Sequence, residues 1–308
     1  DKSFWSNLIS KFINKVVNNN ANNKLNIEDT LTLFLLVLIF VRFKNYYKII
    51  YLLFFSLKRK WMRAALLDFL INEIHFNYNK KYKPNFSSIF LNAGAHIQHH
   101  YLFLSYLNDK KINLDNEYYK KISSKDPIYD ILKVYNWILE DYINCSNILV
   151  ATGLSQKIMN EVLYYYRLKD HNNFLSLLEL DFQSIDTRMS RDFLVSFTDA
   201  IKAKKAESFL KNLKIYETSE SIFEEIENTG KKLFITLTYN KPILKKYTIK
   251  VNNIRFNFFD HVSFVAIKNA EHSGTGYMYT KGEIKKYMPK ENSHVKEIKN
   301  CIEEYFFT

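Results

Sequence analysis

Cysteine, proline and glycine are all scarce in this chain of 308 residues, which contains 2 Cys, 4 Pro and 6 Gly. Cys145 and Cys301 lie far apart in the sequence and do not form a metal-binding spacing. A secreted, disulfide-stabilised scaffold uses more cysteines than this, so a reducing compartment is the simpler interpretation. No secretory signal stands at the start of the sequence, and we therefore expect a cytoplasmic protein.

Several motifs of well-known chemistry are missing as well. The sequence contains no Walker-type phosphate loop, no glycine fingerprint of a dinucleotide-binding domain and no nucleophile-elbow pattern. These absences argue against a P-loop nucleotidase, a Rossmann dehydrogenase and an α/β-hydrolase with a catalytic serine.

The charge balance is basic, with a formal net charge of +12 at pH 7. A basic surface attracts phosphates, nucleic acid or anionic lipid. No basic block interleaved with stacking aromatics stands out, so the sequence does not favour nucleic acid as a partner. A phosphorylated small molecule or a glycan fits better, and the sequence does not fix the oligomeric state.

Residues 1–83 are predicted to form a helical flank or cap. Apolar residues from Phe4 to Val16 recur at three-to-four spacing, as on one face of a helix. The apolar run over residues 31–41 is too short for a membrane span, which needs about 20 residues. A second apolar segment, residues 49–57, runs into the basic residues 58–60. Peripheral contact with a membrane surface is therefore an alternative to a buried helix, and liposome flotation separates the two.

Residues 84–308 are predicted to form an α/β core with a mainly parallel sheet and helices on both faces. The predicted buried strands are residues 86–91, 147–151, 193–197, 233–239 and 262–267, and the predicted helices are residues 130–142, 174–180, 200–213 and 294–305. Ligands of parallel sheets bind beyond the carboxyl ends of the strands. We therefore expect the segments 92–100, 152–155 and 269–276 to converge.

Three histidines lie within five residues, at His96, His99 and His100. If the segment is helical, all three crowd one face, and His96 with His100 could hold one metal ion. Together with His272 they predict a nitrogen-rich site that favours zinc or manganese, with His96, His99 and His272 as ligands and His100 as ligand or general acid. The alternative is that these histidines only form hydrogen bonds within the local structure. Affinity for a metal should fall as the pH drops through about 6.5, because the ligands must be neutral.

Arg191, Gly274 and Gly276 are the candidates for holding a phosphate. Glycines allow the backbone to approach a ligand closely, and an arginine fork can bind two oxygens at once. The alternative for Arg188 and Arg191 is a surface ion pair with Asp186 or Asp192.

These segments resemble the alkaline phosphatase superfamily, in particular its type I phosphodiesterase/nucleotide pyrophosphatase branch. Residues 90–101 fall where that branch has a strand followed by Asp-x-x-x-His, residues 147–155 take the place of its Asp-His-Gly motif, and residues 271–277 match its later histidine loop. The chain departs from the family at Ala95, which replaces the first aspartate, and at Gly153 and Leu154, which replace the Asp-His pair.

The resemblance implies a metal-assisted phosphoester hydrolase acting on a phosphorylated sugar, lipid head group or nucleotide. The missing aspartates leave a second interpretation open, in which the chain is a binding or scaffold relative without catalysis. The family's metal-binding aspartate and its Thr or Ser nucleophile on the first strand have no counterpart in the sequence.

Overall fold

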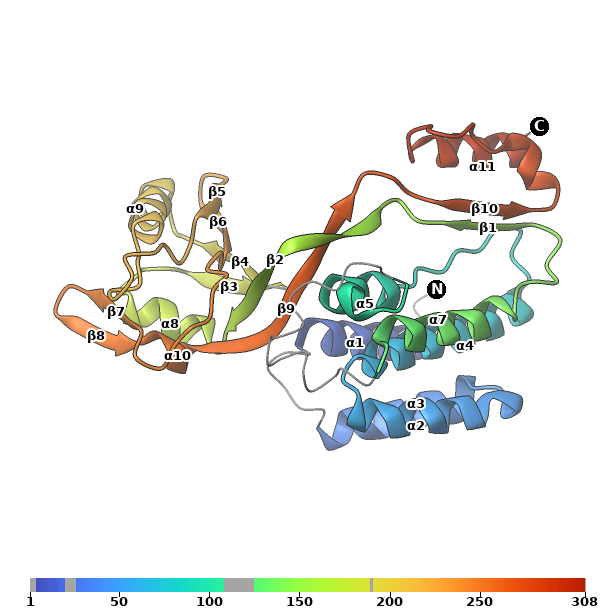
Figure 1. Cartoon of the computed structure of the whole chain (residues 1–308), viewed down its shortest axis with the longest axis horizontal. Coiled ribbons are helices and arrows are strands. Elements are labelled where there is room, and N and C mark those ends of the chain that lie inside the picture. The colour runs from blue at the N-terminus through green and yellow to red at the C-terminus, as the bar shows by residue number, and fades with distance from the viewer. Residues whose placement is uncertain (1–3, 20–25, 108–124, 189–190, 308) are drawn as a thin grey trace. The chain divides into compact units, whose positions relative to one another are not determined.

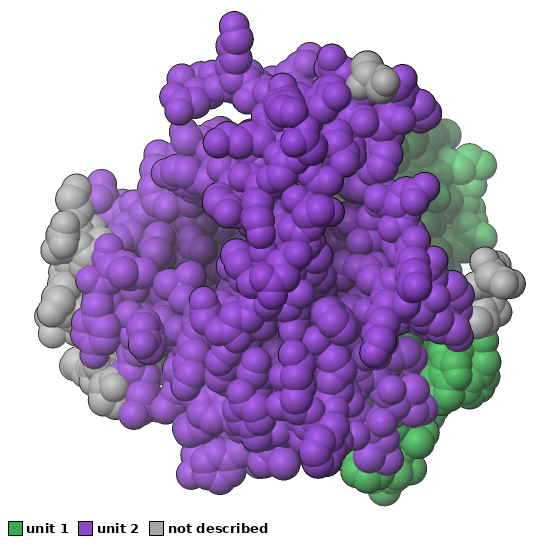
Figure 2. All heavy atoms as spheres, turned by 90° about the vertical axis from the view of Figure 1, so that its right-hand side faces the viewer, with its two compact units in different colours: residues 1–36, 163–267 green, residues 37–162, 268–308 purple. Residues whose placement is uncertain are grey.

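The structure is a computed structural model that describes residues 4–19, 26–107, 125–188 and 191–307. It divides into two compact units, which Figure 2 shows in different colours. The first unit comprises residues 1–36 and 163–267, and the second comprises residues 37–162 and 268–308. These units do not coincide with the expected division after residue 83. The paired strands β2 (Ser155–Leu168) and β9 (Val262–Ser273) each contribute residues to both units.

The expected mainly parallel sheet is wrong. The structure has several small sheets instead, with the orders β1-β10, β2-β9, β3-β4-β6-β5 and β7-β8. The pairings β1–β10, β3–β4, β4–β6, β5–β6 and β7–β8 are all antiparallel.

Short connections explain the antiparallel direction of two of these pairs. Parallel neighbours need a crossover of about a dozen residues or more, whereas antiparallel neighbours can be joined by a tight turn. β7 (Thr248–Val251) and β8 (Ile254–Asn257) are joined by Asn252 and Asn253, and Asn252 has the positive φ of 50° that suits such a turn. Gly230, with φ of 87°, lies in the similarly short turn between β5 (Glu225–Asn228) and β6 (Lys232–Thr236).

The first unit has its core on one face of the four-stranded sheet. Alternate residues of β4 (Asp192–Ser196) and β6 are buried, so that Phe193 lies opposite Ile235 and Val195 lies opposite Leu233 on that face. The edge strands are β3 (Ser184–Thr187) and β5. The helices of this unit's second segment are α8 (His171–Leu177), α9 (Ala200–Lys211) and α10 (Phe258–His261), and α9 packs against β5 and β6.

The second unit is built around packed helices. Its helices are α3 (Tyr46–Lys58), α4 (Met62–Tyr82), α5 (Ala93–Tyr101), α7 (Pro127–Leu139) and α11 (Glu297–Phe307), besides the short η1 (Phe43–Asn45), η2 (Leu102–Leu104) and η3 (Glu283–Tyr287). Helix α4 contacts α3, α5 and α7. Leu52, Met62, Phe69, Ile97 and Val134 are at most 1% exposed and form the core of this packing. The antiparallel pair of β1 (Ile148–Ala151) and β10 (Met278–Lys281) leads through η3 towards α11, as Figure 1 shows.

The predicted N-terminal helices are confirmed as α1 (Phe4–Asn19), α2 (Ile27–Phe40) and α3. Within the described ranges, no helix is long and apolar enough to cross a membrane. Helix α3 exposes Ile50, Phe54 and Leu57, so peripheral contact of this segment with a membrane surface stays a prediction. The strand expected over residues 86–91 is wrong, because these residues have no regular secondary structure.

Candidate functional site

Helix α5 carries the histidine cluster, and a buried carboxylate fixes where this helix begins. Asp68 of α4 accepts hydrogen bonds from the backbone N–H groups of Ala93 (2.8 Å) and Asn92 (3.3 Å). The first N–H groups of a helix lack intrahelical partners and carry partial positive charge, so a carboxylate stabilises them. The hydroxyl of Tyr135 donates to the same carboxylate at 2.9 Å. Asp68 thus ties the start of α5 to both α4 and α7.

Gly94 allows α7 to approach this helix start closely. Its N–H donates to the hydroxyl oxygen of Tyr135 at 2.6 Å. A Cβ atom at this position would lie 2.8 Å from the Tyr135 ring, which is closer than packed atoms tolerate. Gly94 is therefore needed for the close packing of α5 against α7, and this packing orients the histidines.

The histidines form two adjacent ring pairs. His96 and His100, one helical turn apart, have ring centroids 5.1 Å apart. His99 lies beside His272 of β9, with ring centroids 4.7 Å apart. His96 and His272 are exposed, His99 is half-buried and His100 is buried. The structure therefore brings together two histidines that are far apart in the sequence, as the sequence predicted, although no parallel sheet edge is involved.

Both ring nitrogens of His99 have hydrogen-bond partners, and together these partners define its tautomer. The carbonyl oxygen of Ala270 lies 3.2 Å from Nδ1, and since a carbonyl only accepts, Nδ1 carries the hydrogen. The side-chain nitrogen of Gln156 lies 3.0 Å from Nε2 and donates to it. His99 is therefore the neutral tautomer whose Nε2 offers a lone pair, which is the form that coordinates metal ions.

The surroundings of His99 also disfavour its charged form. Burial lowers the pKa of His99 below the usual value of 6.5, and the nearby His272 and Lys268 act in the same direction, while the hydrogen bond to Ala270 opposes them. The His99 ring consequently stays neutral at pH 7. Its protonation would oppose a metal ion only at a lower pH than an unperturbed imidazole would.

The donor set is smaller than the sequence predicted. In the part of the chain that the structure describes, no three or more His, Cys, Asp or Glu side chains are grouped so that they could hold a metal ion. Structural zinc sites use four protein ligands and catalytic ones use three. His99 and His272 fit two positions of such a site, and the other positions would be filled by water or by ligand oxygens.

Of the predicted phosphate-holding residues, Gly274 and Gly276 belong to the same unit as the histidines, and Arg191 does not. Arg191 belongs to the first unit, where its guanidinium carbon lies 4.6 Å from the ring centroid of Tyr165. Gly276 has a structural task, because a Cβ atom there would lie 2.1 Å from the carbonyl oxygen of Thr152. Gly274 is exposed and has open space around it, so its role in holding a phosphate stays a prediction. Arg188 forms the surface ion pair with Asp186, at 3.1 Å.

Thr152 pairs with the backbone beyond Gly276 and so shapes the loop between β1 and β10. Its N–H donates to the carbonyl oxygen of Tyr277 at 2.8 Å, and its hydroxyl accepts from the N–H of Tyr277 at 2.9 Å. Because Gly276 also lies against Thr152, the segments 152–155 and 269–276 meet, as expected.

Sequence reasoning missed three polar residues that position the histidines, namely Gln156, Asn269 and Asp68. Gln156 holds Nε2 of His99, while the side-chain amide of Asn269 donates to the backbone carbonyl of His100 at 2.7 Å. Gln156 directly follows the segment 152–155, and Asn269 is the first residue of the segment 269–276. Their positions next to predicted strand ends therefore indicated that they could lie near the site. Asp68 lies within an apolar helix pattern, and only its burial reveals its task.

Comparison with known proteins gives no relative: no protein-family model, no curated protein and no solved structure matches the chain.

Proposed function

We propose that the chain is a metal-assisted phosphoester hydrolase in which His99 and His272 jointly bind a divalent ion. The single observation that supports this most is the 4.7 Å separation of the two imidazole rings, with His99 held neutral. Imidazole nitrogens without carboxylates favour a borderline ion, zinc or manganese, over magnesium. The substrate class is a phosphorylated sugar, lipid head group or nucleotide.

Each residue of the pair has a separate task in this proposal. His99 presents Nε2 because the carbonyl of Ala270 holds the hydrogen on Nδ1, and the amide of Gln156 withdraws from Nε2 when an ion binds. His272 is exposed and turns to complete the pair without a packing penalty. A bound ion supplies Lewis-acid polarisation of a phosphoryl oxygen. His100, whose ring centroid lies 6.4 Å from that of His99 and 5.1 Å from that of His96, is the group assigned to move a proton.

A second candidate is a binding protein that lacks turnover. Two observations favour it: only two imidazoles form the ligand pair among the described residues, and Gln156 already occupies the lone pair of His99. In this case the ion and a phosphate bind, but no hydrolysis follows.

A hydrolysis assay separates the two candidates. With zinc or manganese added, we expect the full chain to hydrolyse p-nitrophenyl phosphate or bis(p-nitrophenyl) phosphate, and His99→Ala and His272→Ala to lose at least about tenfold in kcat/KM, because an orienting contact to a metal ligand alone is worth about 10–100-fold in affinity or activity. The matched control is His294→Ala, which removes an exposed histidine with no ring contact to the pair.

Two outcomes would contradict a hydrolase that works through the His99–His272 pair. Metal-dependent phosphate binding without turnover would favour the binding protein, and hydrolysis that is equal in all three variants would place the activity away from the His99–His272 pair.

A further inference from the structure

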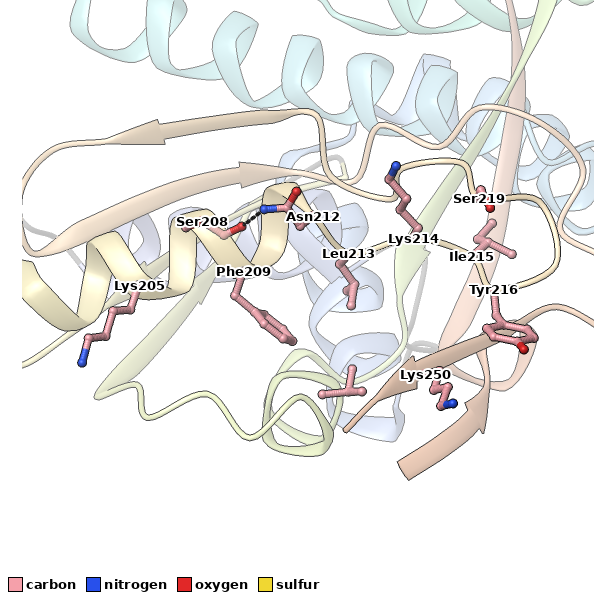
Figure 3. A pocket seen from close by; sticks show the side chains of 11 residues that line it. Lys205, Ser208, Phe209, Asn212, Leu213, Lys214, Ile215, Tyr216, Ser219 and Lys250 are labelled. Atoms are coloured by element: carbon pink, nitrogen blue, oxygen red, sulfur yellow. Dashed lines mark hydrogen bonds between the residues drawn. The ribbon is translucent and has the colours of Figure 1, made fainter. Parts of the chain in front are cut away.

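A solvent-accessible pocket of about 760 Å³ lies entirely within the first unit, at the end of α9. Helix α9, the segment that follows it and the hairpin strand β7 line it, as Figure 3 shows. Its volume is within the range of about 300–1,000 Å³ in which small-molecule sites fall. No residue of the histidine cluster is part of it, so it is independent of the function proposed above.

Three lysines, Lys205, Lys214 and Lys250, line this pocket, and no acidic side chain lines it. Across the described ranges, none of the three forms an ion pair. Neighbouring lysines behave differently: Lys202 and Lys211, also on α9, pair with Asp181 and Glu207, each at 2.6 Å. Among the described residues, the positive charge of the three lining lysines is therefore not compensated by an ion pair.

The pairing of β7 with β8 places a second positive charge beside Lys250. In the β7–β8 ladder Lys250 lies directly opposite Arg255, so both cations occupy the same face. Like charges directly opposite each other destabilise a sheet. Glu217 neutralises Arg255 at 2.9 Å, and both cations lie near the ring of Tyr216, at 4.5 Å for Arg255 and 5.9 Å for Lys250. Lys250 keeps its charge free for an anion.

The floor of the pocket is apolar. Leu213 and Val251 are buried, and Phe209 is partly buried against the core of the first unit. Figure 3 shows Lys205 and Lys250 on opposite sides of Phe209 and Leu213, whereas the side chain of Lys214 points away from these two residues. A ligand that contacts both the apolar floor and the lysines has an apolar or aromatic body and more than one anionic group.

We propose that this pocket binds a small organic polyphosphate, such as a nucleoside triphosphate, with its body on Phe209 and Leu213 and its phosphates against the lysines. Lysine binds phosphate as a mobile point charge, which suits ammonium groups placed at several edges. A nucleic acid fits less well, because a pocket of about 760 Å³ has the size of a small-molecule site rather than of a surface for a continuous phosphate backbone.

Calorimetric titration of the full chain with three probes tests this proposal. We expect adenosine triphosphate to bind more tightly than pyrophosphate, and pyrophosphate more tightly than adenosine. The double variant Lys205→Gln/Lys250→Gln should weaken binding of the triphosphate by about fivefold to thirtyfold, since an exposed charge pair contributes up to about 1 kcal/mol and 1.4 kcal/mol is tenfold. Lys204→Gln is the control, because it removes one positive charge from an exposed position of α9 outside the lining, next to Lys205 in the sequence.

Three results would overturn the proposal. The first is that none of the probes binds. The second is that pyrophosphate binds as tightly as the triphosphate, which means that the apolar floor contributes nothing. The third is that Lys204→Gln weakens binding as much as the double variant, which reduces the effect to general attraction by a basic surface. Zinc binding at the histidine pair does not enter any of these results, so the two proposals fail separately.

Discussion

Replacing Glu73 with alanine is expected to lower the free energy of unfolding of the second unit by about 3 kcal/mol, because the change removes a buried carboxylate that pairs with the partly buried Arg42 and accepts from the buried amide of Asn45. The Glu73 side chain is fully buried. Its carboxylate accepts hydrogen bonds from Nε of Arg42 (3.0 Å), from the backbone N–H of Arg42 (2.8 Å) and from the amide of Asn45 (2.7 Å). Arg42 also donates to Asp141, at 2.9 Å from its Nη1. The network ties the end of α2 to α4 and to the chain after α7.

Urea unfolding followed by tryptophan fluorescence measures this effect, since Trp61 and Trp137 both belong to the second unit. Glu140→Ala is the matched control. Its carboxylate is 58% exposed and lies 3.9 Å from Lys48, so we expect its loss to change stability by less than about 1 kcal/mol. Equal unfolding midpoints for the two variants would show that the buried network does not stabilise this unit.

Acid is expected to destabilise the first unit through His171. This histidine is 7% exposed and packs against the ring of Phe193 at 4.9 Å between centroids. Burial lowers its pKa to about 4, with a further contribution from Arg167 that Asp170 partly opposes. Above about pH 6.5 neither the folded nor the unfolded state binds a proton at this ring, and below it the unfolded state binds one while the folded state does not. Stability should therefore fall by roughly 3 kcal/mol between pH 6.5 and pH 4.

The variant His171→Leu isolates this contribution, because leucine cannot bind a proton. Urea midpoints followed by circular dichroism should fall less steeply with acid in His171→Leu than in the wild type. The control His294→Leu, at an exposed position, should keep the wild-type slope. Identical slopes in the wild type and His171→Leu would mean that His171 is protonated as easily in the folded state as in the unfolded state.

Helices were the part of the fold that the sequence predicted best. The apolar face from Ile131 to Leu139 predicted α7, and the regular spacing after Phe4 predicted α1. The sheet arrangement was not predictable in the same way. Strands such as β5 (Glu225–Asn228) and β3 (Ser184–Thr187) are short and mostly exposed, so they leave no apolar run in the sequence. When these strands are left out, the remaining predicted strands alternate with helices along the sequence, which is the pattern typical of a parallel α/β fold.

The candidate site was also predicted only in part. The spacing of His96, His99 and His100 correctly placed them on one helix, and His272 was correctly grouped with them. The reason for that grouping was wrong, because His272 reaches His99 from β9 rather than from the edge of a parallel sheet. The support from Asp68 and Gln156 depends on contacts between distant segments, which no local pattern in the sequence contains.

Calorimetric zinc titration of the full chain tests the central claim most directly. We expect the wild type to bind one zinc ion, with His99→Ala and His272→Ala each weakening binding by at least about tenfold and His294→Ala leaving it unchanged. Because burial lowers the pKa of His99, the His99 contribution should persist at pH 6.5 and be lost only on further acidification. If the wild type binds no more zinc than the double variant His99→Ala/His272→Ala, the two rings are not a metal ligand pair, and the hydrolase built on them is wrong.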